Sequence, residues 1–235
     1  MAAFVAATAL GADAIEFDVH ATADGQLVVV HDYDLARTTS GTGLVHERDL
    51  AYVRTLSAGR WYGEQFEAER VPFLAEVLEL EDVDFELEVK GLPTADLVSG
   101  VADAVRSARV AERVELTGHH QVALVALRER LPECRLGLFA PAGAPWMTNH
   151  LYQQIVTQTA LCGGFDTVHV PAALIAKIDV ERLHASGLRL HAADPSTADE
   201  LVEAIARSDQ LTTDDPAEAL RLRSESPRRE GGTGS

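Results

Sequence analysis

Short apolar runs alternate with longer segments of helical periodicity along most of the 235-residue chain. Runs rich in Val, Leu and Phe predict strands, and apolar residues that recur every three or four positions predict helices. This alternation is typical of βαβ units on a parallel sheet, and so many units in succession favour a (β/α)8 TIM barrel over an open sheet. The expected strands cover residues 14–19, 27–30, 85–89, 113–117, 135–139, 167–170, 188–192 and 210–214, and the expected helices cover residues 94–108, 122–131, 174–185 and 197–206.

Two regions interrupt the alternation. Residues 27–30 follow the first strand after a turn that is too short for a parallel crossover, so this run either extends that strand or pairs beside it. Residues 33–71 are rich in Gly, Thr and Arg and predict a long excursion over one end of the barrel. Its aromatic side chains, Trp61, Tyr62 and Phe66, either cover a site there or pack within the loop.

The strand count falls one short of a closed barrel. If residues 27–30 belong to their neighbour, seven parallel units remain, and the chain begins inside the helical pattern AAFVAATALG. Eight parallel strands are needed to close a barrel. We therefore expect an α/β barrel domain over residues 1–221 that lacks its first strand, followed by a disordered tail over residues 222–235.

Charged residues occupy two of the expected strands. Residues two apart in a strand share a face, so Glu16 and Asp18 point the same way, and Glu88 and Lys90 do so in the next unit. Both pairs lie near the C-terminal ends of their strands, where barrels carry their active sites. Three converging carboxylates predict a site for Mg²⁺ or Ca²⁺, because these ions prefer oxygen ligands. Without a cation at least one carboxyl would tend to take up a proton.

The motifs around these residues resemble one enzyme family. The stretches GADAIEFDVHATADGQLVVVHDYDLARTTSGTGLV, VPFLAEVLEL, FELEVKG and LTTDDP occur in that order. Together they closely resemble the glycerophosphodiester phosphodiesterase family, densely from Gly11 to Gly91 and again at Thr213 and Asp214. The resemblance implies a TIM barrel that hydrolyses glycerophosphodiesters to glycerol 3-phosphate and an alcohol.

The resemblance also implies roles for individual residues. A divalent cation would be held by Glu16, Asp18 and Glu88, and Lys90 would help to hold the phosphate. The family uses two histidines as general acid and base. One of them corresponds to His31, and the other belongs to a His-Arg-Gly motif at the end of the first strand.

That His-Arg-Gly motif is absent from the 235 residues. The absence agrees with the missing strand, so the chain resembles a family member without its N-terminal segment. Either the start codon is assigned to an internal Met, or the gene is truncated. We expect such a chain to be poorly stable or to form homo-oligomers through the gap, because a lost central strand leaves unpaired backbone groups.

Simpler interpretations compete at each position. Glu16 and Asp18 could be polar residues at a strand end or ion-pair partners of Lys90. Lys90 could form a plain salt bridge with Glu88. His31 could belong to a surface turn. For the whole chain, the alternatives are a relic that binds a cation or phosphate without turnover, and a phospholipase-D-like lyase on the same barrel. The reaction product, an open or a cyclic phosphate, separates the lyase from the hydrolase.

Three other histidines and one aspartate receive less specific interpretations. His20 shares the face of Asp18, but we expect a loop histidine there. His119 and His120 follow the strand at residues 113–117, where the preferred interpretation is a solvent-exposed start of a helix, with contact to substrate as the alternative. Asp214 is expected to cap the last helix.

The amino-acid composition limits the kinds of molecule that the protein is expected to bind. The formal net charge is −17 and no basic stripe offsets it, which argues against nucleic acid and anionic lipid as partners. An anionic substrate would therefore need a metal ion or a buried lysine. The two cysteines, Cys134 and Cys162, lack metal-site spacing, and we expect no disulfide. No run is long enough for a membrane helix and no signal peptide is visible, so a cytoplasmic location is expected, with secretion left open by the missing N-terminal segment.

Overall fold

The computed structural model describes residues 1–225, which form two compact units. The first unit contains residues 1–139 and 158–167, and the second contains residues 140–157 and those from 168 onward. All eight expected strands are present, with ends shifted by two residues at most. They are β1 (Ala14–Ala21), β2 (Leu27–Val29), β3 (Asp84–Val89), β4 (Val114–Thr117), β5 (Arg135–Phe139), β6 (Thr167–Pro171), β7 (Arg189–Ala193) and β8 (Gln210–Thr212).

Helices connect most of these strands. The α-helices are α1 (Ala2–Leu10), α2 (Leu50–Val53), α3 (Leu74–Leu78), α4 (Ala95–Ala108), α5 (Gln121–Arg130), α6 (Asn149–Gly163), α7 (Val180–Ala185), α8 (Ala198–Arg207) and α9 (Pro216–Glu225). Four 3₁₀ turns accompany them in the described chain, namely η1 (Val45–Glu47), η2 (Glu64–Phe66), η3 (Ala111–Arg113) and η4 (Ala172–Lys177). The mixed α/β class is confirmed.

Two helical predictions need correction. The helix expected over residues 174–185 is divided into η4 and α7, because Asp179 is extended and its side chain accepts a hydrogen bond from the amide of Arg182, which starts a new helix. Helix α6 was not predicted. Its buried residues Tyr152, Val156 and Ala160 recur every four positions, so the helical signal was present in the sequence.

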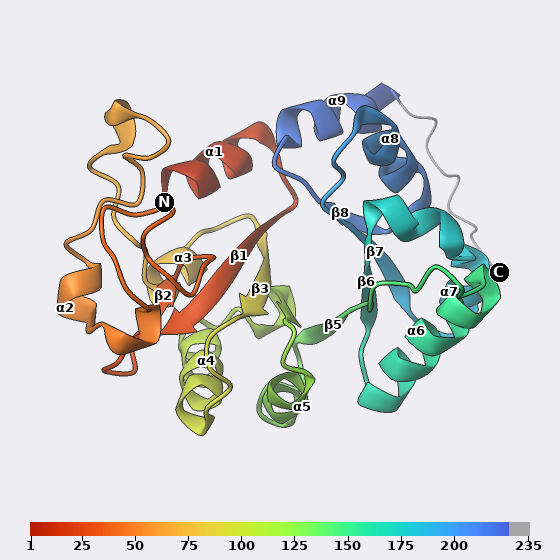
Figure 1. Ribbon diagram of the computed structural model, residues 1–235, viewed down its shortest axis with the longest axis horizontal. Coiled ribbons are helices and arrows are strands. Elements are labelled where there is room, and N and C mark those ends of the chain that lie inside the picture. The colour runs from red at the N-terminus through yellow and green to blue at the C-terminus, as the bar shows by residue number, and fades with distance from the viewer. Residues whose placement is uncertain (226–235) are drawn as a thin grey trace. The chain divides into compact units, whose positions relative to one another are not determined.

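In the first unit the strands lie in the order β2-β1-β3-β4-β5. Neighbouring pairs from β1 to β5 are parallel, and β2 is antiparallel to β1, with Val19 opposite Val29. The short turn before Leu27 therefore closes a hairpin, one of the two predicted arrangements. In the second unit β6, β7 and β8 follow one another in the sheet, and β7 and β8 are parallel. Figure 1 shows α4 and α5 beside each other; α4 also packs against α3 and β2, and α5 packs against β5.

Strand β1 separates apolar from polar side chains as its alternation predicts. Phe17 packs against Phe4 of α1 and Phe85 of β3, with ring centroids 6.0 and 6.1 Å apart. Asp18 and Glu16 have the opposite parity and lie on the other face. Helix packing on one face therefore leaves the carboxylates directed to the interior face of this sheet.

The excursion after β2 is a folded layer with an apolar core of its own, drawn in orange in Figure 1. Arg54 anchors it by an ion pair of 2.9 Å with Glu76 of α3 and by a hydrogen bond to the carbonyl of Val71. Trp61 and Tyr62 contact each other edge to face at its surface and are 56% and 73% exposed. The buried members of this core are Val28, Val30, Leu35, Val45, Val53, Leu56 and Val71.

The C-terminal part differs from the prediction in two respects. Helix α9 continues to Glu225, four residues into the segment expected to be a disordered tail; residues 226–235 lie outside the described part. Its N-terminal cap is Asp215, which accepts a hydrogen bond from the amide of Glu218, rather than Asp214.

Both cysteines are unpaired, as expected. Among residues 1–225, no helix combines the length and the apolar character needed to cross a membrane.

Candidate active site

The pairing of β1 with β3 brings three acidic side chains together. Asp18 is opposite Glu88 in the parallel register, and Glu16 is opposite Glu86 one step earlier. Asp18, Glu88 and Glu16 each offer a carboxylate oxygen, and these oxygens lie within 4.8 Å of one another. The three predicted metal ligands therefore form one candidate metal-binding group, built by a single strand pair.

Without a cation, burial and mutual repulsion disfavour the ionised form of these carboxyl groups. Burial, followed by the charges of Asp18, Glu86 and Glu88, raises the pKa of Glu16 to about 9. Burial also raises the pKa of Glu88 to about 7, although Lys90 acts in the opposite direction. Carboxylates crowded in this way must either share protons or hold a positive ion.

The donor set fits a hard divalent cation. All three groups are carboxylates, the ligand type that Mg²⁺ and Ca²⁺ prefer. Oε1 of Glu88 is buried and accepts no hydrogen bond from a donor in residues 1–225. A buried acceptor without a donor is unfavourable unless an ion or water satisfies it. The residues present therefore suit the ion that the sequence predicted.

Lys90 supplies the positive charge that the described chain places at this cluster. Its Nζ lies 3.1 Å from Oδ1 of Asp18, 3.3 Å from Oε2 of Glu88 and 3.0 Å from Nε2 of His31. Burial lowers the pKa of Lys90, but the carboxylates of Asp18 and Glu88 raise it by more, so the net shift is upward. Lys90 is therefore charged at neutral pH and links the acidic cluster to the histidine.

His31 is placed by the chain that leaves β2. The amide of Val30 donates to the carbonyl of Asp18, which brings the end of the hairpin over the carboxylates. Nδ1 of His31 donates to Oδ1 of Asp32 at 2.6 Å, and Arg37 holds the same carboxylate through two nitrogens at 2.5 and 2.7 Å. The Arg37 bonds keep the pKa of Asp32 well below its usual range. This network assigns the proton to Nδ1 and leaves Nε2 as an acceptor.

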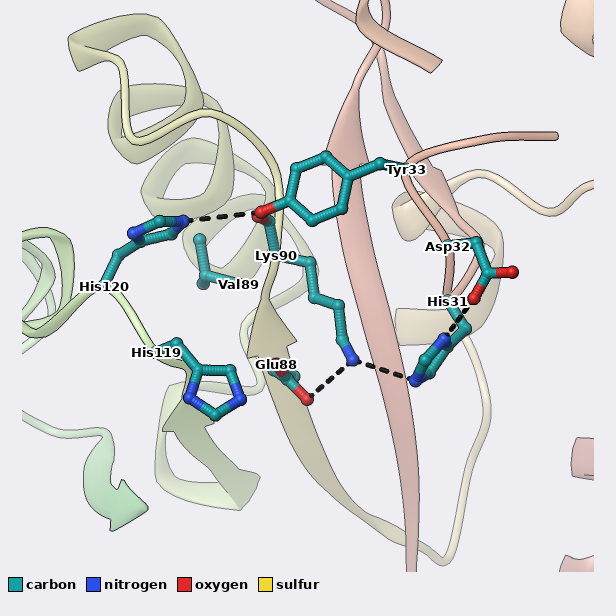
Figure 2. A pocket seen from close by; sticks show the side chains of 8 residues that line it. All are labelled: His31, Asp32, Tyr33, Glu88, Val89, Lys90, His119 and His120. Atoms are coloured by element: carbon teal, nitrogen blue, oxygen red, sulfur yellow. Dashed lines mark hydrogen bonds and ion pairs between the residues drawn. The ribbon is translucent and has the colours of Figure 1, made fainter. Parts of the chain in front are cut away.

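These residues open into one cavity of about 370 Å³. Figure 2 shows the side chains of Lys90 and Glu88 near its centre and His31 on one side. The lining residues are His31, Asp32, Tyr33, Glu88, Val89, Lys90, His119 and His120. The predicted catalytic histidine and the predicted phosphate ligand thus share a cavity with one of the predicted metal ligands.

His119 and His120 lie at the start of helix α5, as the preferred interpretation expected, with His119 exposed and His120 at the N-cap position, and both also line the cavity. The hydroxyl of Tyr33 donates to the carbonyl of Lys90 and lies 3.5 Å from Nε2 of His120. Tyr33 was not singled out from the sequence. The signal for the two histidines was their place after the C-terminal end of β4, beside the strand that carries Glu88.

One other prediction for this region is wrong, and one open alternative is decided. His20 is not a loop histidine: it is a buried residue of β1, and its Nε2 lies 3.2 Å from the carbonyl of His31. Of the two interpretations of Trp61, Tyr62 and Phe66, packing within the loop is supported, because none of these three side chains belongs to the described lining of the cavity. Nε1 of Trp61 donates to the carbonyl of Ala58, and the ring of Tyr62 contacts Phe66, so these side chains pack within their own loop.

The sequence was compared with known protein families. The model of the glycerophosphoryl diester phosphodiesterase family matches residues 1–217. The chain belongs to this family. A glycerophosphodiester phosphodiesterase of Caldanaerobacter subterraneus subsp. tengcongensis is 37% identical over 153 residues, which make up 62% of this chain. The match covers 63% of that relative, so the chain spans less than two thirds of its length.

Solved structures of this family share the fold. A glycerophosphodiester phosphodiesterase from Agrobacterium tumefaciens aligns with a TM-score of 0.77 at 24% identity, covering 94% of this chain and 90% of that one. A phosphodiesterase from Oleispira antarctica, solved in complex with the product sn-glycerol-3-phosphate, aligns with a TM-score of 0.78 at 21% identity, covering 95% and 89%. The predicted fold class, an α/β barrel of phosphodiesterase type, is confirmed.

Proposed function

We propose that this protein hydrolyses glycerophosphodiesters to glycerol 3-phosphate and an alcohol with the help of a divalent cation, Mg²⁺ or Ca²⁺. One observation carries the proposal: Lys90 joins the carboxylates of Asp18 and Glu88 to Nε2 of His31 within 3.3 Å. A phosphodiester needs positive charge for its oxygens and an acceptor for a proton, and this arrangement offers both. Membership in the family supports the substrate class.

The cation would be held by Glu16, Asp18 and Glu88. When bound, it would stabilise negative charge on the phosphate oxygens and orient the phosphate. Lys90 would bind a second phosphate oxygen and, in doing so, would release Nε2 of His31. The long, charged side chain suits this exchange, because it already spans the distance between the carboxylates and the imidazole.

His31 would act as the general base. Its Nε2 would accept the proton of the attacking hydroxyl, either water or the 2-hydroxyl of the glycerol moiety, and its Nδ1–H would remain bonded to Asp32. A histidine held in one tautomer by a carboxylate does not have to reorient before it accepts the proton. Arg37 fixes that carboxylate in turn.

The experiment is an assay of glycerophosphocholine hydrolysis with Mg²⁺, with Ca²⁺ and with a chelator. We expect cation-dependent release of glycerol 3-phosphate, and a loss of about 10²–10⁴-fold in His31→Gln. The matched control is His46→Gln, because His46 lies in η1 outside the cavity. Absence of release with either cation would contradict the proposal, and a lasting cyclic phosphate product would instead indicate the lyase.

A further inference from the structure

One row of side chains crosses three neighbouring strands at the level of the candidate cation site. Asp18 of β1 lies opposite Glu88 of β3, and Glu88 lies opposite Thr117 of β4. Both pairings are parallel, and side chains in register point to the same face of a sheet. Thr117 is therefore on the interior face, next to Glu88 on the side away from Asp18. The function proposed above gives Thr117 no role.

The hydroxyl of Thr117 has no partner in the described part of the chain. The residue is fully buried, and within residues 1–225 no hydrogen bond reaches its Oγ1. A buried hydroxyl without a partner disfavours the folded state, because folding removes it from water. One step earlier on the same face of β4, Glu115 pairs with Arg135 at 3.3 Å and accepts a hydrogen bond from Thr167 at 3.1 Å. The unpartnered hydroxyl is thus particular to the level of Glu88.

Glu88 has an acceptor that matches this donor. Lys90 lies 3.3 Å from Oε2 of Glu88 (Figure 2), whereas Oε1 is buried and accepts no hydrogen bond from a donor in the described chain. Thr117 and Glu88 therefore present an unused donor and an unused acceptor on adjacent strands in direct register. A rotation about the Cα–Cβ bond of Thr117, or one bridging water, would join the two groups.

We propose that Thr117 is a positioning residue for Glu88 when the cation is bound, an inference that rests on the function proposed above. The Thr117 hydroxyl donates to Oε1 of Glu88, directly or through a water, while Oε2 keeps its contact with Lys90. A carboxylate oxygen has two lone pairs, so it can accept a hydrogen bond and bind an ion at the same time. Hydrogen bonds of this kind orient metal ligands, and their loss typically weakens metal binding about 10–100-fold.

Replacement of Thr117 by Val and by Ser tests the hydroxyl. Val has nearly the same shape without the hydroxyl, whereas Ser keeps the donor. By isothermal titration calorimetry with Mg²⁺ and with Ca²⁺, we expect Thr117→Val to raise the cation Kd by about 10–100-fold and Thr117→Ser to keep the Kd of the unmodified protein. A saturating cation concentration should restore kcat for glycerophosphocholine in Thr117→Val, since the residue acts through the binding of the ion.

Thermal melts in chelator distinguish positioning from a structural role. Thr117→Val should melt no lower than the unmodified protein, because it removes a hydroxyl that has no partner in the cation-free state. The matched control is Thr167→Val, because the Thr167 hydroxyl is equally buried but donates to Glu115. This control should lower the melting temperature and leave the cation Kd unchanged.

The outcomes separate this inference from the proposed function. An unchanged cation Kd in Thr117→Val, an equal rise in Thr117→Ser, or a melting temperature lowered as much as in Thr167→Val would overturn the role of Thr117. If the unmodified protein binds the cation without hydrolysing glycerophosphocholine, and only the Val variant binds it weakly, the inference stands and the proposed function fails. If the unmodified protein binds neither cation, both fail.

Discussion

Nζ of Lys90 lies 3.0 Å from Nε2 of His31, although the two residues are 59 positions apart in the chain. The contact exists because β3 ends beside β1 and the β1–β2 hairpin returns over the same end. Through this contact the ammonium group of Lys90 occupies Nε2 of His31, the nitrogen that we propose as the base. Phosphate binding to Lys90 would free that nitrogen. The same lysine neutralises part of the carboxylate cluster, so its removal should affect stability as well as binding.

Replacement of Lys90 by Met should destabilise the cation-free protein at pH 8 by about 3 kcal/mol, because a buried charge pair loses one partner. At pH 5 the loss should be smaller, since Glu88, whose pKa is about 7, is ionised at pH 8 but carries a proton at pH 5. Urea denaturation at both pH values measures the difference. Lys177, the chain's other lysine, provides the control Lys177→Met. Equal destabilisation of the Lys90 variant at pH 5 and pH 8 would argue against a role in charge neutralisation.

The carboxylate cluster also predicts a pH dependence of stability in the absence of cation. The folded-state pKa values of Glu16 and Glu88 are about 9 and about 7, above the ordinary value of 4.5. The folded protein therefore binds more protons than the unfolded chain between pH 4.5 and 9, and the free energy of unfolding should fall as the pH rises through this range. Thermal melts in chelator from pH 5 to 9 measure this slope.

Added Mg²⁺ or Ca²⁺ should reverse the loss at high pH, because the deprotonated carboxylates bind the ion and binding stabilises the folded state. A saturating ion at a hundred times its Kd corresponds to about 2.7 kcal/mol. Glu88→Gln should weaken both the pH slope and the response to the ion. If the melting temperature at pH 8 is the same with and without Mg²⁺ or Ca²⁺, the cluster does not bind these ions.

Asp32→Asn should lower kcat by about 10²-fold with little change in KM, because the amide no longer selects the Nδ1–H tautomer of His31. The fold should persist, since His31 and Arg37 are both well exposed and the ion pair lies at the surface. Steady-state kinetics and a thermal melt check both parts. Asp34→Asn is the control, because that side chain caps the amide of Ala36 instead. A raised KM with unchanged kcat would point to substrate binding rather than to orientation of the base.

Gly118→Ala should destabilise the protein by about 1–3 kcal/mol and displace the segment that carries His119. The cost combines a positive φ with a contact of 2.8 Å to the carbonyl of Val89, which is backbone and cannot swing away. Gly164→Ala is the control for the cost of a positive φ alone, because φ there is +68° and a Cβ would meet nothing within 4 Å. Equal losses in the two variants would show that the close approach contributes little.

The sequence alone determined the strands and the face on which the acids lie. Period-two alternation is a local property of an extended chain, so the common direction of Glu16 and Asp18 followed directly from their spacing. The order of apolar runs similarly predicted the α/β class. Where local signals were mixed, as over residues 174–185, the prediction merged two helical segments that Asp179 separates.

Only the tertiary structure decided which residues meet. The register of β1 against β3 sets Asp18 beside Glu88, and one residue of slippage would have put the acids on opposite faces. His119 and His120 enter the cavity because β4 pairs with β3 and Gly118 lets the backbones approach, neither of which is encoded in the spacing of the histidines. Local pattern fixes the direction of a side chain, whereas its partners depend on long-range pairing that a single sequence does not display.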